Sequence, residues 1–462
     1  MSLTKLHQFF CHTCTAFLVS GLFLSGCSQS ETSDSAYANL DTLDVSIGYW
    51  NIEDMSNIQK DAMRDYLEKK FSISINPISV DWSNYKDYYQ MLSVTNSLPD
   101  VFATLTISSN DTNDSAYYED LIRNGSIQPL PDDLSAWPNL EKLMNQLDYT
   151  RYSDGHFYAI PRISFVDPTL ACSDAAMIVR RDWMENLGLD DPSNIDEFID
   201  LVAAFANDDP DQNGLDDTIG YNVNATNALG KWVMLGIAPD CNTYSWIDQD
   251  GTYIPSWYSE QFRDVVSAYR KMYETGGLDP NFYLKNPNEV ITDFASGKLG
   301  ALEYKSSPSS IQLLAEQWNL YNDKPFEECV DVLPMFPSPD GTIYCNSSNP
   351  FWSESFISSS ADEKKTERIL ALFDFLLSEE GLHMSKYGLE TVDYKIDSSG
   401  NYTCLLDTNK TSLLTLLENK YPSIVLFSGL ATWGGSDDDF ELNEMNFARY
   451  GKHCVTLANK DV

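Results

Sequence analysis

The chain has 462 residues, 43% of them hydrophobic and 13% aromatic, so it is long enough for two domains and too apolar to be wholly disordered. Its formal net charge of −39 argues against nucleic acid as a partner, because binding phosphates draws on Lys and Arg. The 10 Trp and 26 Tyr exceed what packing needs. Most such rings belong to cores, but rings on loops commonly stack on sugar faces or anchor an interface.

The first 26 residues have the pattern of a signal peptide. Lys5 precedes an apolar run over residues 9–24 that is too short to span a bilayer, and the run ends in LSGC, with the cysteine at position 27. This ending resembles a bacterial lipobox, which implies cleavage before Cys27 and a lipid, diacylglycerol with palmitate, at its sulfur. The alternative is an ordinary signal peptide with an unmodified cysteine. Residues 27–43 are polar and predict a flexible tether, which would leave the body on the extracellular face of a bacterial cell membrane.

Six cysteines remain in the body of the chain. They are widely spaced and contain no CxxC pair, so neither a zinc site nor a redox motif is indicated. Six cysteines allow fifteen complete disulfide pairings, and the sequence selects none of them. They are Cys172, Cys241, Cys329, Cys345, Cys404 and Cys454.

The structured region begins with alternating strand and helix patterns. Residues 45–49 and 71–75 alternate as strands, and a helical pattern at 63–67 separates them. A second helical pattern at 85–92 leads to a short strand at 100–104. This order predicts an α/β fold with mixed, mostly parallel sheets flanked by helices.

Two Asp-Gly pairs predict hairpin turns. Asp154-Gly155 lies between residues 149–152 and 157–160, and Asp250-Gly251 lies within residues 246–254. Asp-Gly suits the two central positions of a tight turn, which require positive φ angles. We therefore expect a β-hairpin at each place.

A helix is predicted just after residue 194. Asn194 and Glu197 have the spacing of a capping box, in which each side chain accepts a backbone N–H of the other's turn. The following apolar residues fall at i, i+3, i+4 and i+7 and so predict a buried helix face. They are Phe198, Leu201, Val202 and Phe205.

The acidic run after this helix has the spacing of a cation-binding loop. Counted from Asp209, oxygen-bearing side chains fall at positions 1, 3, 5 and 9, and a glycine lies at position 6. Hard oxygen donors in this order suit Ca²⁺, although position 12 is Gly220 where an EF-hand has a bidentate Glu. The alternative is an ordinary surface turn, because Asp, Asn, Gly and Pro favour turns. The candidate ligands are Asp209, Asp211, Asn213, the carbonyl of Leu215, and Asp217.

Several of these segments together resemble a known family. The runs IVRRDWMENLGL, PSNIDEF and DDPDQNGLDDTIGY are similar to those of family 1 extracellular solute-binding lipoproteins, which deliver oligosaccharides to ABC importers. In that family the acidic loop is a structural Ca²⁺ site, although the chain has Thr218 where the family often has a further acid. The resemblance implies a two-lobed periplasmic-binding-protein-like fold of type II, with a hinge between the lobes.

Other segments extend the resemblance towards the C-terminus. HFYAIPR is similar to the segment where the family's chain first crosses between lobes, which would put Arg162 at the hinge, facing the cleft. FASGKLGAL resembles a return strand into the N-lobe, and SEEGLHMSKYGLETVDYKI resembles the terminal pattern. We expect 1–26 as signal peptide, 27–43 as tether, 44–162 and 291–350 as N-lobe, and 163–290 and 351–462 as C-lobe.

The common local signatures of catalysis are missing from the sequence. It contains no HExxH, GxSxG or GxxxxGKS motif, which disfavours zinc peptidases, α/β-hydrolases and nucleotide-binding enzymes. A glycosidase stays open because its two carboxylates have no fixed sequence spacing. A calcium-stabilised surface adhesin also fits the anchor and the rings. We predict a monomeric binding protein that is not an enzyme, with a carbohydrate ligand and an ABC permease as partners.

The predicted ligand contacts are aromatic rings and polar groups near strand ends or on loops. Trp50 and Asn51 follow the first strand, where open parallel sheets bind ligands. Rings would stack on sugar faces, and amides and carboxylates would bind hydroxyls. The remaining candidates are Trp82, Arg162, Trp232, Tyr304, Trp352 and Trp433.

Overall fold

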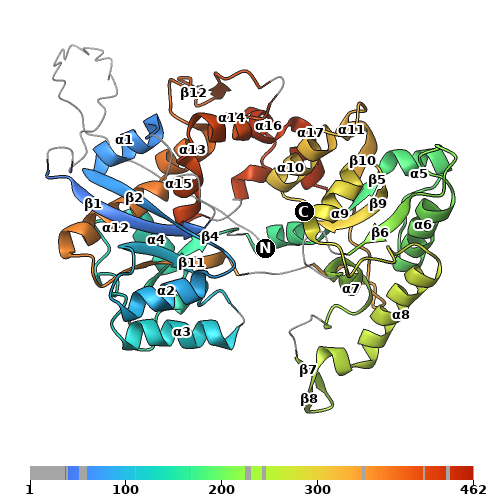
Figure 1. Cartoon of the computed structure of the whole chain (residues 1–462), viewed down its shortest axis with the longest axis horizontal. Helices are drawn as coiled ribbons and strands as arrows, with labels where there is room; N and C mark the ends of the chain where they lie inside the picture. The colour runs from blue at the N-terminus through green and yellow to red at the C-terminus, as the bar shows by residue number, and fades with distance from the viewer. Residues whose placement is uncertain are drawn as a thin grey trace, which may run out of the picture.

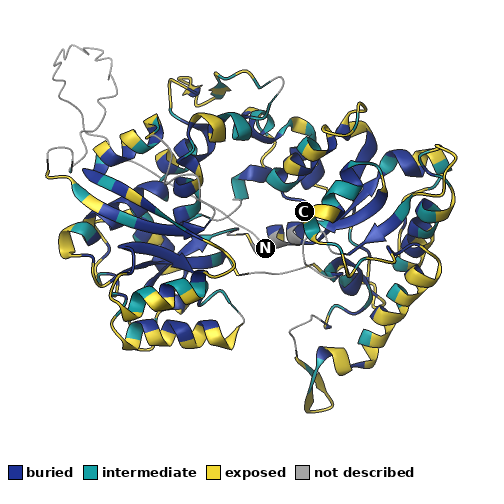
Figure 2. Cartoon of the chain, in the orientation of Figure 1, coloured by how far each residue is buried: buried dark blue, intermediate teal, exposed yellow. Residues whose placement is uncertain are grey.

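The computed structural model describes residues 37, 40–50, 60–109, 111–165, 167–223, 230–241, 246–345, 349–408, 411–432 and 437–460. The chain forms two α/β lobes, each around its own mixed sheet (Figure 1). The sheets and the inner helix faces are buried, and the outer helix faces are exposed (Figure 2). Within the described residues, no helix combines the length and the apolar character needed to cross a bilayer.

The first lobe contains a five-stranded sheet in the order β2-β1-β3-β11-β4. Strand β1 is parallel to β2 and β3, whereas β11 lies antiparallel between β3 and β4. These strands are β1 (Leu43–Trp50), β2 (Ile73–Val80), β3 (Val101–Thr104), β4 (Ala159–Ile163) and β11 (Phe351–Ile357).

Helices with apolar side chains in the first core surround this sheet. Several begin at an aspartate whose carboxylate accepts backbone N–H groups of the first turn, as Asp61 and Asp362 do. The helices are α1 (Ala62–Phe71), α2 (Tyr85–Val94), α3 (Thr112–Arg123), α4 (Pro138–Gln146), α12 (Glu363–Leu376), α13 (Glu379–Tyr387), α14 (Leu413–Lys420) and α15 (Ile424–Ala431).

The second lobe contains a four-stranded sheet in the order β10-β5-β9-β6. Only β6 and β9 pair in parallel, so the expectation of a mostly parallel sheet is wrong for this lobe. The strands are β5 (Ala176–Arg180), β6 (Ile219–Asn222), β9 (Leu299–Tyr304) and β10 (Val330–Leu333). The helices are α5 (Arg181–Leu187), α6 (Ile195–Asn207), α7 (Lys231–Ile237), α8 (Glu260–Glu274), α9 (Pro287–Ala295), α10 (Pro308–Trp318), α11 (Phe326–Cys329), α16 (Glu444–Tyr450) and α17 (Lys452–Ala458).

Short elements complete the described chain. Two small antiparallel sheets consist of β7 (Trp246–Gln249) with β8 (Thr252–Pro255) and of β12 (Tyr394–Ile396) with β13 (Tyr402–Cys404). The 3-10 helices are η2 (Asp148–Thr150), η3 (Pro168–Asp174), η4 (Ser256–Tyr258) and η5 (Asp437–Phe440).

The hairpin predictions have different outcomes. The hairpin at Asp250-Gly251 is confirmed, since β7 pairs with β8 and both turn residues have positive φ angles of 54° and 82°. At Asp154-Gly155 the chain turns, but it forms no hairpin. Strand β4 pairs with β11 instead, almost 190 residues further along the chain, and a local pattern carries no information about such a partner.

The predicted lobe boundaries need correction. Strands β9 and β10 lie in the sheet of β5 and β6, so residues 291–350 do not return to the first lobe as expected. Strand β11 and helices α12, α13 and α15 belong to the first lobe, so residues 351–431 are not part of the second. The chain therefore crosses between lobes from β4 to β5, from β10 to β11, and from α15 to η5. The first crossing is close to the expected position, at Arg162.

The core of the second lobe contains a buried carboxyl group. Glu303 on β9 is fully buried and accepts the backbone N–H groups of Lys231 and Trp232 at the start of α7. Its Oε2 lies 3.4 Å from the hydroxyl of Tyr221. Burial raises the pKa of Glu303 from its ordinary value of 4.5 to about 7, because a charge is costly away from water.

This raised pKa predicts pH-dependent stability. The folded chain holds the Glu303 proton more tightly than the unfolded chain does. The resulting contribution of Glu303 to the free energy of unfolding is present below pH 4.5 and is lost as the pH rises to about 7. Glu303→Gln, which imitates the protonated group, should be more stable than the wild type at pH 8 by as much as about 3 kcal/mol and similar at pH 5. Urea unfolding at both pH values measures this. The exposed Glu185→Gln is the control, and equal pH dependence in wild type and Glu303→Gln contradicts the assignment.

Candidate ligand-binding site

Four aromatic rings gather at one edge of the first sheet. The ring of Trp50 lies 5.1 Å from that of Trp82, 5.0 Å from that of Tyr85 and 5.8 Å from that of Trp352. Trp82 stacks on Tyr85 at 5.2 Å and lies 5.5 Å from Trp352. We call these four residues the ring cluster.

Sheet topology explains why these rings meet. Trp50 is the last residue of β1, and Trp82 follows the end of β2, so both lie at the carboxyl edge of parallel strands. Strand β11 is antiparallel, so its beginning, with Trp352, reaches the same edge. Ligands of open α/β sheets commonly bind at the carboxyl ends of parallel strands.

The members of the ring cluster differ in exposure. Trp82 is 47% exposed, whereas Trp50 is 1% exposed and is covered by its neighbours. The indole Nε1 of Trp50 is buried and has no hydrogen-bond partner among the described residues. Trp82 therefore offers an aromatic surface at this edge, with the partly buried Trp352 beside it. The prediction that Trp50 contacts a ligand directly is wrong for this structure, in which Trp50 supports the other rings.

Beneath the ring cluster lies a buried network of charged and polar groups. The guanidinium of Arg162 donates from Nε to the carbonyl of Gly429 at 2.6 Å and from Nη1 to Oγ of Ser353 at 2.5 Å. Its Cζ lies 4.5 Å from the ring of Tyr49 and 5.5 Å from that of Trp50. Burial lowers the pKa of Arg162, and the charge of Glu354 opposes this change.

Glu354 fixes the loop that follows β3. Its carboxylate accepts the backbone N–H of Thr106 at 2.8 Å, the hydroxyl of Thr106 at 2.7 Å and the backbone N–H of Ser108 at 2.7 Å. Burial raises the pKa of Glu354, and these hydrogen bonds oppose the rise because they stabilise the charged form. The network therefore rigidifies the edge at which Trp82 and Trp352 lie.

Other predicted contact residues lie elsewhere. Trp232 is fully buried against Phe198 and Phe336 in the second core, which contradicts its prediction as a ligand contact. Arg162 is at a lobe crossing as predicted, but it is buried rather than exposed to a cleft. Tyr304 ends β9 and packs against the second core, and burial raises its pKa. Asn51, Trp433 and Cys27 lie outside the described residues.

Tyr85 is a ring-cluster member that the sequence interpretation missed. Its spacing with Tyr88, Tyr89 and Leu92 predicted a helix, and Tyr85 is buried at the start of α2. Tyr85 lies three residues after Trp82, and this spacing indicates a shared site only once the order of β1, β2 and β11 is known.

The acidic loop folds with its polar groups turned towards one another. The Asn213 amide donates to Asp211 at 2.8 Å and to Asp217 at 3.2 Å, and the Asp209 carboxylate accepts the backbone N–H of Gly214 at 3.0 Å. Burial, followed by the neighbouring Asp209 and Asp217, raises the pKa of Asp211. Asn186 on α5 donates to the carbonyl of Pro210 and so ties the loop to the lobe.

Within the described ranges, no group of three or more His, Cys, Asp or Glu side chains is already arranged to hold a metal ion. The acidic loop instead combines three carboxylates with an amide and a backbone carbonyl. This donor set consists of hard oxygens, which suit Ca²⁺.

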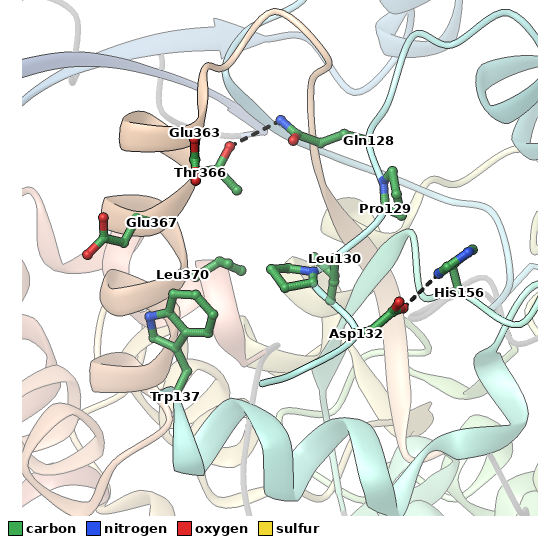
Figure 3. A pocket seen from close by; sticks show the side chains of 11 residues that line it. Gln128, Pro129, Leu130, Asp132, Trp137, His156, Glu363, Thr366, Glu367 and Leu370 are labelled. Atoms are coloured by element: carbon green, nitrogen blue, oxygen red, sulfur yellow. Dashed lines mark hydrogen bonds and ion pairs between the residues drawn. The ribbon is translucent and has the colours of Figure 1, made fainter. Parts of the chain in front are cut away.

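Two pockets lie outside the ring cluster. The first has a volume of about 600 Å³ and lies between the loop 128–137 and α12, with Trp137 and Leu370 contributing apolar surface (Figure 3). Asp132, Glu363 and Glu367 give it acidic groups. The second, of about 550 Å³, lies between α13, β13 and α16 and contains His383 and Tyr402. None of the predicted ligand contacts lines either pocket.

Two α/β lobes joined by three chain crossings are the architecture of a solute-binding protein. The chain belongs to the family of bacterial extracellular solute-binding proteins, whose family model matches residues 49–382. The family is one of extracellular proteins that bind solutes.

Relatives support this assignment. The chain is 26% identical to lipoprotein LipO of Bacillus subtilis over 406 residues, which is 86% of this chain and 76% of LipO. It is 22% identical over 391 residues to YtcQ of the same organism, a polygalacturonan/rhamnogalacturonan-binding protein, covering 84% of this chain and 74% of YtcQ.

Solved structures share the fold. The substrate-binding protein FusA of S. pneumoniae in complex with kestose is 18% identical, with a TM-score of 0.63 over 91% of this chain and 83% of FusA. A second structure, that of a FusA EF-hand mutant in complex with fructo-nystose, has a TM-score of 0.62, 18% identity and the same coverage. At this identity the likeness concerns the fold alone.

Proposed function

We propose that this protein is a lipid-anchored receptor that captures a carbohydrate, an oligosaccharide, between its two lobes and delivers it to an ABC transporter permease. The observation that carries the proposal is the half-exposed ring of Trp82, supported by Trp50 and Tyr85 and flanked by Trp352. Sugar rings present flat apolar faces that stack on such surfaces. YtcQ and FusA, which are named for carbohydrate ligands, are similar to this chain and support the same ligand class.

Binding is expected to close the lobes without changing the ligand. A ligand shifts a conformational equilibrium only by its difference in affinity for the two states, so a sugar that touches both lobes favours the closed state. The ring cluster would supply the surface of the first lobe. Polar groups of the second lobe would complete the contact with the ligand.

The carbohydrate proposal predicts the effect of removing one ring. Trp82→Ala should weaken sugar binding by about 1–3 kcal/mol, on the scale of burying a large apolar side chain, and should leave the fold intact because the ring is half exposed. A thermal-shift screen of mono- and oligosaccharides finds the ligand, and calorimetry then measures the variant. Trp257→Ala removes a ring of similar exposure, 51%, from the second lobe and is the matched control.

Two outcomes would overturn the carbohydrate proposal. A screen in which no sugar stabilises the protein, followed by binding to a peptide or a cell-surface partner, would favour an adhesin. Chromatography that finds cleaved sugar after long incubation would identify a glycosidase.

The acidic loop is proposed as a structural Ca²⁺ site. Asp209, Asp211, Asn213, the carbonyl of Leu215, and Asp217 would hold the ion, which relieves the repulsion between carboxylates brought together by the loop. Burial raises the pKa of Asp211, and the neighbouring carboxylates of Asp209 and Asp217 add to this rise. The FusA EF-hand mutant indicates a comparable motif in a protein of the same fold.

Calcium should stabilise the folded chain by mass action. At 100 times the dissociation constant, a single site contributes about 2.7 kcal/mol, so added Ca²⁺ should raise the melting temperature and EGTA should lower it. Asp217→Asn should reduce the response, while Asp216→Asn, in the same loop but outside the proposed ligand set, should retain it. A melting temperature that is the same in EGTA and in Ca²⁺ would exclude the site.

Attachment through Cys27 is proposed from the lipobox-like sequence, and the name of lipoprotein LipO supports it. Cys27→Ser should abolish labelling with palmitate and release the protein from the membrane fraction, because one short apolar run cannot hold it there. Cys345→Ser, which removes an exposed cysteine of the body, is the control. Continued labelling of Cys27→Ser would show that the lipid is attached elsewhere or that the anchor is different.

A further inference from the structure

The side chain of Arg162 contacts all three connections between the lobes at their first-lobe ends. Arg162 itself is the penultimate residue of β4, before the first crossing. Its partner Ser353 lies near the start of β11, just after the second crossing. Its other partner, Gly429, lies in the last turn of α15, just before the third crossing. A single guanidinium thus joins segments that are 191 and 267 residues away in sequence.

Backbone contacts hold the same three segments together one and two residues after Arg162. The N–H of Ser164 donates to the carbonyl of Pro350 at 2.9 Å, which links the first and second connections. Ile163 forms a parallel bridge with Thr432, which links the first and third. The three connections therefore run side by side where they leave the first lobe, and Arg162 lies at that point.

The same guanidinium supports the ring cluster. It lies over the ring of Tyr49 at 4.5 Å and near that of Trp50 at 5.5 Å, and Trp50 contacts Trp82 and Trp352. The Tyr49 hydroxyl donates to the carbonyl of Gly429 at 2.8 Å, the acceptor that Arg162 also uses. A continuous set of contacts thus leads from the exposed ring of Trp82 to the interlobe connections.

The chemistry of the site favours arginine. A planar guanidinium presents several N–H donors in fixed directions, so it reaches Ser353 and Gly429 at once while its face lies on a ring. A lysine ammonium is a single point of charge and cannot hold this arrangement. Because Arg162 is fully buried, losing a hydrogen-bond partner would leave a buried charge uncompensated. This cost holds its partners in place.

We propose that Arg162 is a positioning residue that fixes the three interlobe connections against the ring cluster and thereby sets the balance between open and closed lobes. Its side chain acts without touching the ligand. The part of the inference that concerns ligand affinity rests on the proposed carbohydrate function, whereas the part that concerns the ligand-free conformation does not.

The test compares Arg162→Gln, Arg162→Lys and Ser353→Ala with the wild-type chain. Small-angle X-ray scattering gives the distribution of open and closed forms without and with the stabilising sugar, and calorimetry gives the affinity. The matched control is Arg368→Gln, because Arg368 is also buried in the first lobe, donates to the carbonyl of Phe71 and lies on the ring of Tyr37, away from every crossing.

Arg162→Gln should change the ligand-free scattering and weaken sugar affinity by about 10-fold, the size expected when the competent conformation becomes rare. Ser353→Ala should change the ligand-free scattering and the sugar affinity in the same direction, but by less. If Arg162→Gln does not fold, Ser353→Ala alone tests the inference. Arg162→Lys should recover little. Arg368→Gln should lower the melting temperature and leave scattering and affinity unchanged.

Two results would overturn the inference. Wild-type scattering and affinity in both Arg162→Gln and Ser353→Ala would limit Arg162 to a stabilising role, and so would equal effects in Arg368→Gln. If no sugar binds the wild type, the proposed function fails, while the ligand-free scattering still decides the role of Arg162.

Discussion

The burial of two opposite charges at the carboxyl edge of the first sheet constrains much of the first lobe. Arg162 and Glu354 are both removed from water, so each must keep its hydrogen-bond partners or leave a costly charge behind. Glu354 needs the backbone of the loop after β3, and Arg162 needs the end of α15. Ser353, between them in the sheet, takes a φ of 63°, a strained conformation that the surrounding contacts hold.

Local sequence signals predicted local structure well. The helix after Asn194 is present, and its predicted apolar face is buried. The capping pattern is only half formed, because Glu197 accepts from Ser193 rather than from Asn194. The hairpin at Asp250-Gly251 is present because its turn requires two positive φ angles that these residues tolerate. The sheet to which β9 and β10 belong was wrongly predicted, since strand partners lie far apart in sequence.

The candidate site was predicted less well for a related reason. Trp82 and Trp352 were predicted as contacts because they were expected on loops, and the sheet order brings them together. Trp50 was predicted from its place at the end of the first strand and Trp232 as a ring on a loop, yet both are buried. A tryptophan at a strand end or on a loop faces ligand or core according to the neighbours that cover it. Those neighbours, such as Tyr85 for Trp50 and Phe336 for Trp232, come from other parts of the chain.

The place of β11 between β3 and β4 has a consequence for the order of folding. The four strands of the second sheet come from one continuous stretch, from Ala176 to Leu333, whereas the first sheet lacks an interior strand until residue 357 has been made. Closing so long a loop is entropically costly and slow. During synthesis from the N-terminus, the edges of β3 and β4 that pair with β11 therefore stay unpaired while the second sheet is completed. The first sheet, although it contains the earliest strands of the chain, is thus completed after the second sheet.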